Sequence, residues 1–86
     1  MSKFQVFVLF INCDINTQTL TFDEKTVSYN TFIDTLKLKS DIIKNIFNRT
    51  HISIRLYKSN KLIQLINNLI ELNNFETFKI YLYSKN

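Results

Sequence analysis

Hydrophobic and polar residues alternate along several short stretches of this chain, which is the pattern of β-strands with one buried face. The first predicted strand spans residues 4–11 and is apolar on both faces apart from Gln5, as expected for a central strand. After a turn rich in Asn and Asp, a cleanly alternating strand is predicted at residues 18–23. Two more strands are predicted at residues 51–57 and 77–83.

Between the second and third of these strands the apolar spacing becomes helical. Ser28 is a good N-cap, and a helix is predicted over residues 28–40. A second apolar cluster at helical spacing follows in residues 42–47. Either the helix continues or a short second helix follows, and we expect a break near residues 40–41. The sequence leaves the conformation of residues 43–50 open. The apolar stripe of the predicted helix consists of Tyr29, Phe32, Ile33 and Leu36.

The segment before the last strand is less regular. A short return strand is predicted at residues 62–65 after a tight turn, followed by a helical turn and loop over residues 67–74 in which Leu69 and Leu72 face inward. The order of the main elements is β-β-α-β-β. We therefore predict a single α+β domain covering residues 1–86, with one helix packed on a mixed four- to five-stranded sheet.

The composition suits a small folded domain with a mild preference for anionic partners. The chain is 45% hydrophobic, has a formal net charge of +4 and contains neither Gly nor Pro. Cys13 is the only cysteine, which excludes an internal disulfide and favours a reducing, intracellular (cytoplasmic) location. The apolar run near the N-terminus is too short to span a bilayer, so no membrane partner is expected.

No constellation of residues indicates catalysis or cofactor binding. His51 is the only histidine, and no nucleophile pairs with it recognisably. With one His and one Cys, a metal site of nitrogen and sulfur ligands is implausible, and there is no Gly-rich loop to hold phosphates. We therefore expect a protein that is not an enzyme and that uses no cofactor, metal or small-molecule substrate.

Three segments of the chain resemble the ubiquitin-like β-grasp family. Residues 4–8 resemble its opening strand, residues 19–42 its second strand and helix, and residues 54–83 the remainder. The resemblance rests on hydrophobic positions and loop lengths, and it implies a β-grasp sheet in which the first and last strands are neighbours and the third lies beside the last. The core spacing of the family is repeated by Tyr29, Phe32, Leu36 and Ile42.

Departures from the family's pattern bear on function. Conjugated members end in Gly-Gly, whereas this chain ends in LYSKN and has no Gly, so no conjugation role is expected. The segment after residue 42 is longer than the family's loop there. The apolar patch that the family offers to receptors is also changed, with Arg55 or Tyr57, Lys79 and Tyr81 at the matching positions.

The predicted sheet face away from the helix is the candidate functional surface. Exposed aromatic side chains beside Arg and Lys are typical of protein interfaces, although Tyr can also simply cover a sheet with its hydroxyl in water. The candidate partner-binding residues on this face are Phe7, Leu9, Arg55, Tyr57, Lys79, Tyr81 and Tyr83.

Two hypotheses for function remain. The first is a non-enzymatic, non-conjugated ubiquitin-like interaction module, a small accessory subunit that binds a protein partner in a larger assembly. The alternative is a basic, ribosome-associated ribonucleoprotein component, in which Tyr stacks on bases and cations neutralise phosphates; a scattered set of solvated charges is the plainer interpretation. The candidate RNA-binding residues are Arg55, Lys58, Lys61, Lys79 and Lys85.

Overall fold

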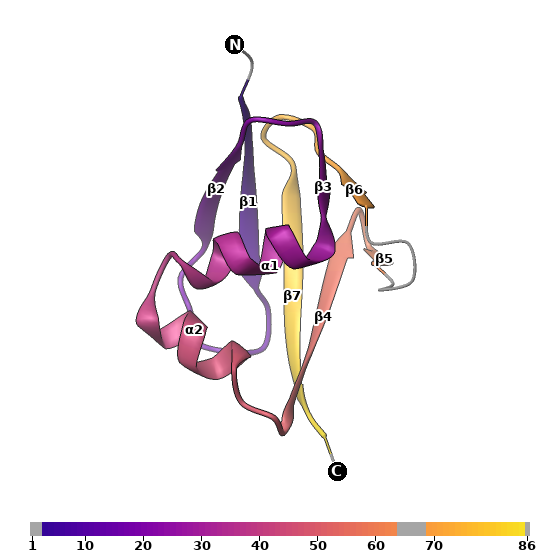
Figure 1. The fold of residues 1–86 in the computed structure, drawn as a ribbon. Coiled ribbons are helices and arrows are strands. Elements are labelled where there is room, and N and C mark those ends of the chain that lie inside the picture. The colour runs from indigo at the N-terminus through magenta and orange to yellow at the C-terminus, as the bar shows by residue number, and fades with distance from the viewer. Residues whose placement is uncertain (1–2, 64–68, 86) are drawn as a thin grey trace.

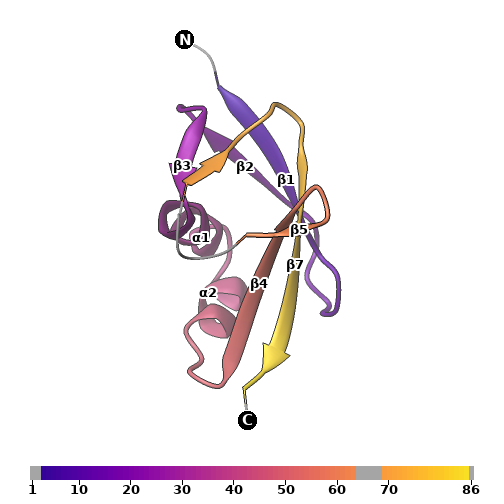
Figure 2. The same cartoon turned by 90° about the vertical axis from the view of Figure 1, so that its right-hand side faces the viewer.

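The computed structural model describes residues 3–63 and 69–85, and Figure 1 shows how their elements are arranged. One layer is a five-stranded sheet, and two helices cover one of its faces (Figure 2). Two short strands, β3 (Thr26–Ser28) and β6 (Leu69–Glu71), pair separately as an antiparallel ribbon. The architecture is α+β and compatible with a β-grasp-like fold, but it contains more elements than the predicted β-β-α-β-β order.

The five-stranded sheet is mixed. β1 runs parallel to β7, and the other neighbouring strands are antiparallel. The expectations that the first and last strands are neighbours, and that the strand after the helices lies beside the last, are therefore confirmed. The spatial order is β2 (Gln18–Phe22), β1 (Phe4–Phe10), β7 (Thr77–Ser84), β4 (Ile52–Lys58) and β5 (Lys61–Leu62).

The helices are α1 (Tyr29–Lys37) and α2 (Asp41–Phe47), so of the two alternatives for residues 42–47 the short second helix is the one observed, in addition to the one helix of the predicted β-β-α-β-β order. Each begins after a serine whose side-chain oxygen accepts a backbone N–H three residues further on, at 3.0 Å for Ser28 and 3.2 Å for Ser40. The predicted break near residues 40–41 is confirmed, but α1 ends before Leu38. Neither helix of the described residues is long and apolar enough to cross a bilayer.

The hydrophobic core lies between the helices and the sheet. Phe32 of α1 is fully buried, and its ring centroid lies 4.9 Å from that of Phe78 and 5.7 Å from that of Phe22. Leu36 is also fully buried, whereas Tyr29 is half-buried at the rim. The predicted inward face of the first helix is therefore confirmed, with Tyr29 at its margin.

The expectation that Ile42 belongs to the core is wrong. A new helix starts at Asp41 after the Ser40 cap, and this restart sets which residues face the sheet. Ile43 is fully buried, whereas Ile42 is 66% exposed. The extra residues of this segment thus form a second capped helix, and its inward stripe begins one residue later than the resemblance implied.

The ribbon of β3 and β6 replaces the predicted helical turn. Val27 lies opposite Ile70, and both side chains are buried. Strand alternation turns Leu69 outward, where it is 71% exposed, so the expectation that it faces inward is wrong; Leu72 is fully buried, as predicted. No propensity signal marked residues 26–28 as a strand, because so short a strand forms only through its partner.

The predicted return strand at residues 62–65 is present as β5, which begins one residue earlier and pairs with the end of β4. Ser59 and Asn60 form the turn between them, both with positive φ, at 50° and 65°. Asn tolerates this left-handed conformation better than most residues, which explains how the turn forms without Gly. The predicted return strand also included residues 64–65, and the predicted helical turn began with residues 67–68; these four residues lie outside the described residues.

Candidate interaction surface

The candidate surface is the face of the five-stranded sheet opposite the helices, which we call the outer face (Figure 2). Along β1, β7 and β4 the even-numbered residues point to the core and the odd-numbered residues point outward, as the burial of Val8, Ile80 and Leu56 indicates. The strand register places Leu9 opposite Lys79, and Lys79 opposite Tyr57. All seven predicted partner-binding residues therefore share this face.

The β1 side of the outer face is apolar. The ring of Phe7 stacks on that of Phe75, with centroids 6.5 Å apart and an interplanar angle of 19°. Leu9 lies two residues further along the same strand face, and both Phe7 and Leu9 are half-buried. Phe75 is 63% exposed, so the stacked pair presents one ring largely to solvent. We call Phe7, Leu9 and Phe75 the apolar patch.

Phe75 was missed by the sequence prediction, and its backbone is unusual. Its φ is 64°, in the left-handed region that bulky residues rarely occupy. Its N–H donates to the carbonyl of Gln5 at 2.6 Å, and the Asn74 side-chain oxygen accepts the N–H of Gln5 at 2.9 Å. These bonds fix the loop against β1, so the exposed ring is held in place at an energetic cost.

The β4 side of the outer face is aromatic and basic. Tyr57 and Tyr81 meet edge to face with centroids 5.3 Å apart, and Tyr81 and Tyr83 are nearly parallel at 6.3 Å. The guanidinium carbon of Arg55 lies 4.5 Å from the ring centre of Tyr83, within the range of a cation–π contact. We call these four residues the tyrosine cluster. A shallow hollow beside it is lined by Tyr57, Asn60, Lys79, Tyr81 and Tyr83.

Two asparagine side chains position this cluster. β1 ends at Phe10, and beyond it the Asn12 amide donates to the Leu82 carbonyl at 2.8 Å and accepts the Leu82 N–H at 2.9 Å. The amide thus takes the place of a strand and fixes the backbone between Tyr81 and Tyr83. The Asn60 side-chain oxygen accepts from the ammonium group of Lys79 at 3.2 Å.

The structure separates the predicted RNA-binding residues. Arg55 and Lys79 lie on the outer face with the tyrosines. Lys58 points to the other side of β4, where its partly buried side chain donates to the Glu71 carbonyl and its ammonium nitrogen lies 3.8 Å from the Glu76 carboxylate. Lys61 lies opposite Lys58 on β5, and Lys85 follows the end of β7. Lys58 and Lys61 therefore do not join the tyrosine cluster.

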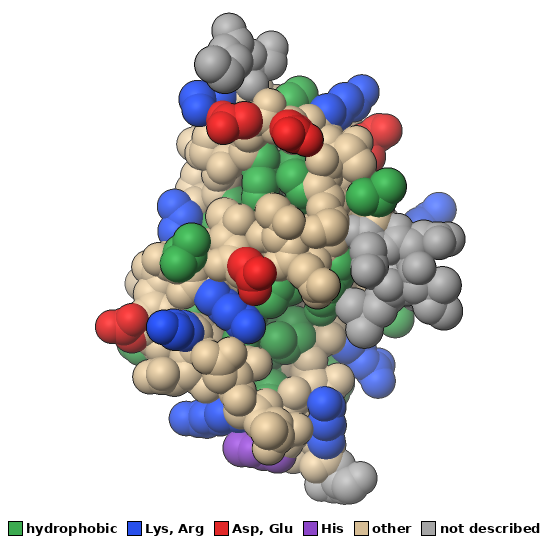
Figure 3. Space-filling model, viewed as in Figure 1, with side chains coloured by type: hydrophobic (Ala, Val, Ile, Leu, Met, Phe, Trp, Pro, Cys, Tyr) green, Lys and Arg blue, Asp and Glu red, His purple; other side chains and the backbone are tan. Residues whose placement is uncertain are grey.

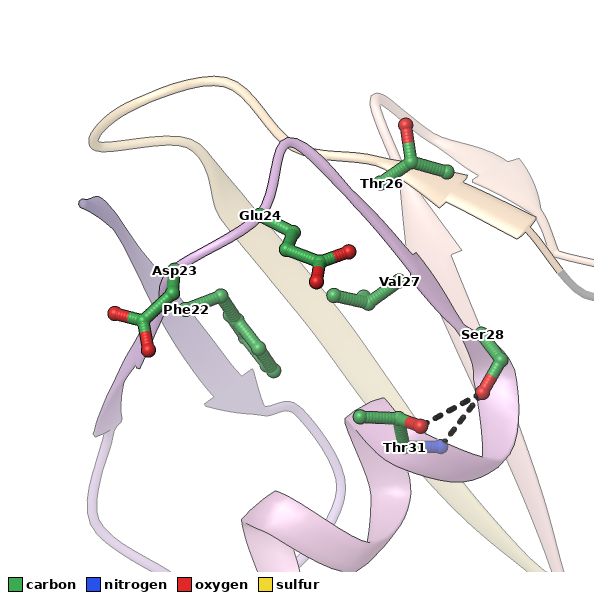
Figure 4. A pocket seen from close by; sticks show the side chains of 7 residues that line it. All are labelled: Phe22, Asp23, Glu24, Thr26, Val27, Ser28 and Thr31. Carbon is green, nitrogen blue, oxygen red and sulfur yellow. Dashed lines mark hydrogen bonds between the residues drawn. The ribbon is translucent and has the colours of Figure 1, made fainter. Parts of the chain in front are cut away.

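Another hollow lies between the β2–β3 turn and the start of α1 (Figure 4). Its floor is apolar, and Glu24 extends over it from the rim. The hydroxyls of Ser28 and Thr31 bond each other at 2.9 Å, and Ser28 also caps the helix, so both are engaged in local structure. Asp23 points away from the hollow and pairs with Lys3 at 2.6 Å. The arrangement offers no convergent set of free polar groups.

Two ionisable side chains of the described residues, those of Tyr29 and Cys13, have a pKa that is shifted from its ordinary value. Burial raises the pKa of the Tyr29 hydroxyl. Burial, and secondarily the charge of Asp14, raise the pKa of the Cys13 thiol, which makes it a poorer nucleophile near neutral pH. Within residues 3–63 and 69–85, no three His, Cys, Asp or Glu side chains gather where they would hold a metal ion.

Comparisons with known proteins leave the family of this chain unassigned. No protein-family model matches its sequence, and no curated protein matches it either.

Proposed function

We propose that this protein is a non-enzymatic, non-conjugated interaction module that docks into a larger protein assembly through the apolar patch on its outer sheet face. The ubiquitin-like resemblance of the sequence agrees with such a role, because small β-grasp domains present a sheet face to their partners. The partner contributes an apolar segment that covers Phe7, Leu9 and Phe75.

The observation that carries the proposal is the conformation of Phe75. A left-handed φ of 64° in a bulky residue disfavours the folded chain by about 1–3 kcal/mol. An apolar ring that is 63% exposed contributes little to the core in return. Asn would adopt the same backbone more easily, and the two preceding residues are both Asn. A phenylalanine at this position is explained if the ring is buried in a complex.

The surroundings of the patch also suit an interface. Aromatic rings at the centre of an interface, with a cation at its margin, follow the usual division into an apolar core and a polar rim. Lys79 lies opposite Leu9 on the neighbouring strand and so places a cation beside the patch. A partner with a carboxylate beside its apolar segment would complement this arrangement.

The proposal is tested by affinity isolation from a native lysate with three versions of the protein as bait. The wild type and a Leu38→Asn variant are expected to retain the same protein, whereas a Phe75→Asn variant loses it. Leu38 is the matched control because it is 87% exposed but lies beyond the end of α1, on the helix side of the sheet. Each residue of the apolar patch is expected to contribute about 1–3 kcal/mol to binding of the partner.

The proposal fails if the Phe75→Asn bait retains its partner as well as the wild type does. It also fails if the Leu38→Asn bait loses the partner to the same extent, because the helix side would then be the interface. Circular dichroism and denaturant unfolding of each bait establish that the variants are folded before they are compared.

A further inference from the structure

The tyrosine cluster lies in a part of the chain without acidic residues. No Asp or Glu occurs in residues 42–70 or in residues 77–86, which include all of β4 and β7. The seven acidic residues of the chain fall elsewhere, so no carboxylate of β4 or β7 opposes the charge of Arg55 or Lys79. A ligand on this part of the outer face therefore meets the charges of Arg55 and Lys79 with no carboxylate on the same two strands.

Further basic residues lie at one end of the sheet. The Lys85 N–H donates to the His51 carbonyl at 2.7 Å, and the Ile52 N–H donates to the Arg49 carbonyl at 3.3 Å. These backbone bonds bring the backbones of Arg49, His51 and Lys85 to the end of the sheet where β4 begins and β7 ends. Figure 3 views this end from the helix side, and on that side Lys and Arg side chains lie near the purple His51 and no acidic side chain lies beside it. We call Arg49, His51 and Lys85 the basic end.

The aromatic geometry favours a planar ligand. Tyr81 and Tyr83 occupy alternate positions of one strand and are inclined by only 17°, so they form two parallel steps along β7. Tyr83 is 38% exposed, and the hollow beside Tyr81 opens to solvent. The planar guanidinium group of Arg55 already packs on the ring of Tyr83. Nucleic-acid bases stack on such rings whatever their identity, while cations along the track neutralise phosphates.

We propose that the tyrosine cluster and the basic end form a binding site for single-stranded nucleic acid. Bases stack on Tyr81 and Tyr83, and Arg55, Arg49 and Lys85 contact the phosphates. This goes beyond the docking role of the apolar patch, because it uses the other side of the outer face and a different class of ligand. It also replaces Lys58 and Lys61 of the sequence prediction with Arg49, which the sequence alone did not suggest.

The test is fluorescence anisotropy with a labelled oligouridine of about twelve nucleotides, a length within the range of single-stranded sites. The full chain is titrated at several salt concentrations, and an oligothymidine of the same length tells RNA from DNA. Affinity is expected to fall steeply with salt, and Arg49→Gln and Lys85→Gln each reduce the slope by about 0.7, the value for one phosphate contact on a single strand. Lys25→Gln, a charge-matched change outside the basic end, leaves the slope within error.

Stacking is tested separately from charge. Tyr83→Leu keeps an apolar side chain of moderate size but removes the ring, and it is expected to weaken oligouridine binding about 5- to 150-fold, whereas Tyr83→Phe binds almost as the wild type does. Equal affinity of the Leu and Phe variants overturns the proposal. So does competition by polyglutamate as strong as that by unlabelled oligouridine, which would make the site a general acceptor of acidic polypeptides.

The proposals for the two sites can be contradicted independently of each other. Phe75→Asn is expected to leave oligouridine affinity unchanged, and Tyr83→Leu is expected to leave capture of the protein partner unchanged. If both variants lose oligouridine binding, the proposal that nucleic acid binds at the tyrosine cluster and the basic end, apart from the apolar patch, is contradicted. Retained capture by Phe75→Asn removes the docking proposal without touching this one.

Discussion

The two faces of the same sheet use aromatic residues in opposite ways. On the inner face, Phe78 alternates with Ile80, both are fully buried, and Phe78 meets Phe32 of α1. On the outer face of the same strand, Tyr81 and Tyr83 keep a hydroxyl and share the surface with Arg and Lys. Along β7 the alternation alone does not say which face is buried, but Phe and Ile on one face, and Tyr with Lys on the other, do.

The outer face itself is divided. Its β1 side carries the stacked pair of Phe7 and Phe75, and its β4 side carries the tyrosine cluster with its cations. The first resembles the apolar centre of a protein interface, and the second resembles a track for an anionic chain. Variants that affect only one face, or only one side of the outer face, therefore separate stability from binding.

The largest expected difference is between the stability losses caused by substitutions on the two faces. Phe32→Ala removes a ring that packs between Phe22 and Phe78, and we expect it to lower the free energy of unfolding by about 3–5 kcal/mol. Tyr81→Ala, on the outer face, is expected to lower it by about 1 kcal/mol, since its ring contacts are partly solvated. Urea unfolding followed by circular dichroism measures both. Equal losses would mean that the outer face is as important to stability as the core.

The next largest effect is expected from Asn12, whose side chain holds the β7 backbone between Tyr81 and Tyr83. Asn12→Ala leaves the N–H and C=O of Leu82 without their partner, and we expect a loss of about 1–3 kcal/mol in the free energy of unfolding. Amide hydrogen exchange at Leu82 is expected to accelerate. Asn45→Ala, at an exposed position of α2, is the control and is expected to change stability by less than about 0.5 kcal/mol. Unchanged exchange at Leu82 in Asn12→Ala would show that the β7 backbone is held by other contacts.

The main strands are predictable from the sequence because their signals are local. In the last strand the even-numbered residues are apolar and the odd-numbered ones are polar or Tyr, so a period of two assigns both faces of that strand. The first strand is apolar on both faces apart from Gln5, and that pattern predicts its central place in the sheet. The seven partner-binding residues follow from that period together with the neighbourhood of the first and last strands. The helix break near residues 40–41 follows from a serine that caps α2.

The features that the sequence did not predict depend on contacts between distant segments. β3 becomes a strand only because β6 pairs with it, and Leu69 turns outward for the same reason. Phe75 stacks on Phe7 because backbone bonds to Gln5 fix the loop, and no local pattern encodes this. Lys58 lies away from the tyrosines because β4 extends one residue beyond the predicted end at Tyr57, and the alternation of the strand then turns Lys58 toward Glu76.

A smaller effect on stability tests the strain at Phe75. In Phe75→Asn the relief of an unfavourable backbone conformation offsets the loss of ring stacking, so the free energy of unfolding is expected to change by less than about 1 kcal/mol. Chemical denaturation measures the change. A loss above about 2 kcal/mol would indicate that the Phe7–Phe75 pair stabilises the fold and would weaken the case for an interface.

The smallest expected effect is a pH dependence of the free energy of unfolding, which comes from Tyr29 at the rim of the inner face. Burial raises the pKa of Tyr29 above its ordinary value of 10.0, so the folded state favours the neutral phenol. The stabilisation is complete below the unfolded-state pKa and is lost as the pH rises through the folded-state pKa, since the unfolded chain ionises first. Tyr29→Phe is therefore expected to flatten the decline in stability above about pH 10. Parallel declines in the two proteins would show that Tyr29 does not contribute.

The central claim, that the apolar patch is buried against a protein partner, is tested most directly by isothermal titration calorimetry with the captured partner. The wild type is expected to bind with a negative heat capacity change, the mark of apolar burial, and Phe75→Asn is expected to bind about 5- to 150-fold more weakly with a smaller heat capacity change. Leu38→Asn is expected to match the wild type. Identical affinity and heat capacity change in the Phe75→Asn and wild-type proteins would contradict the account.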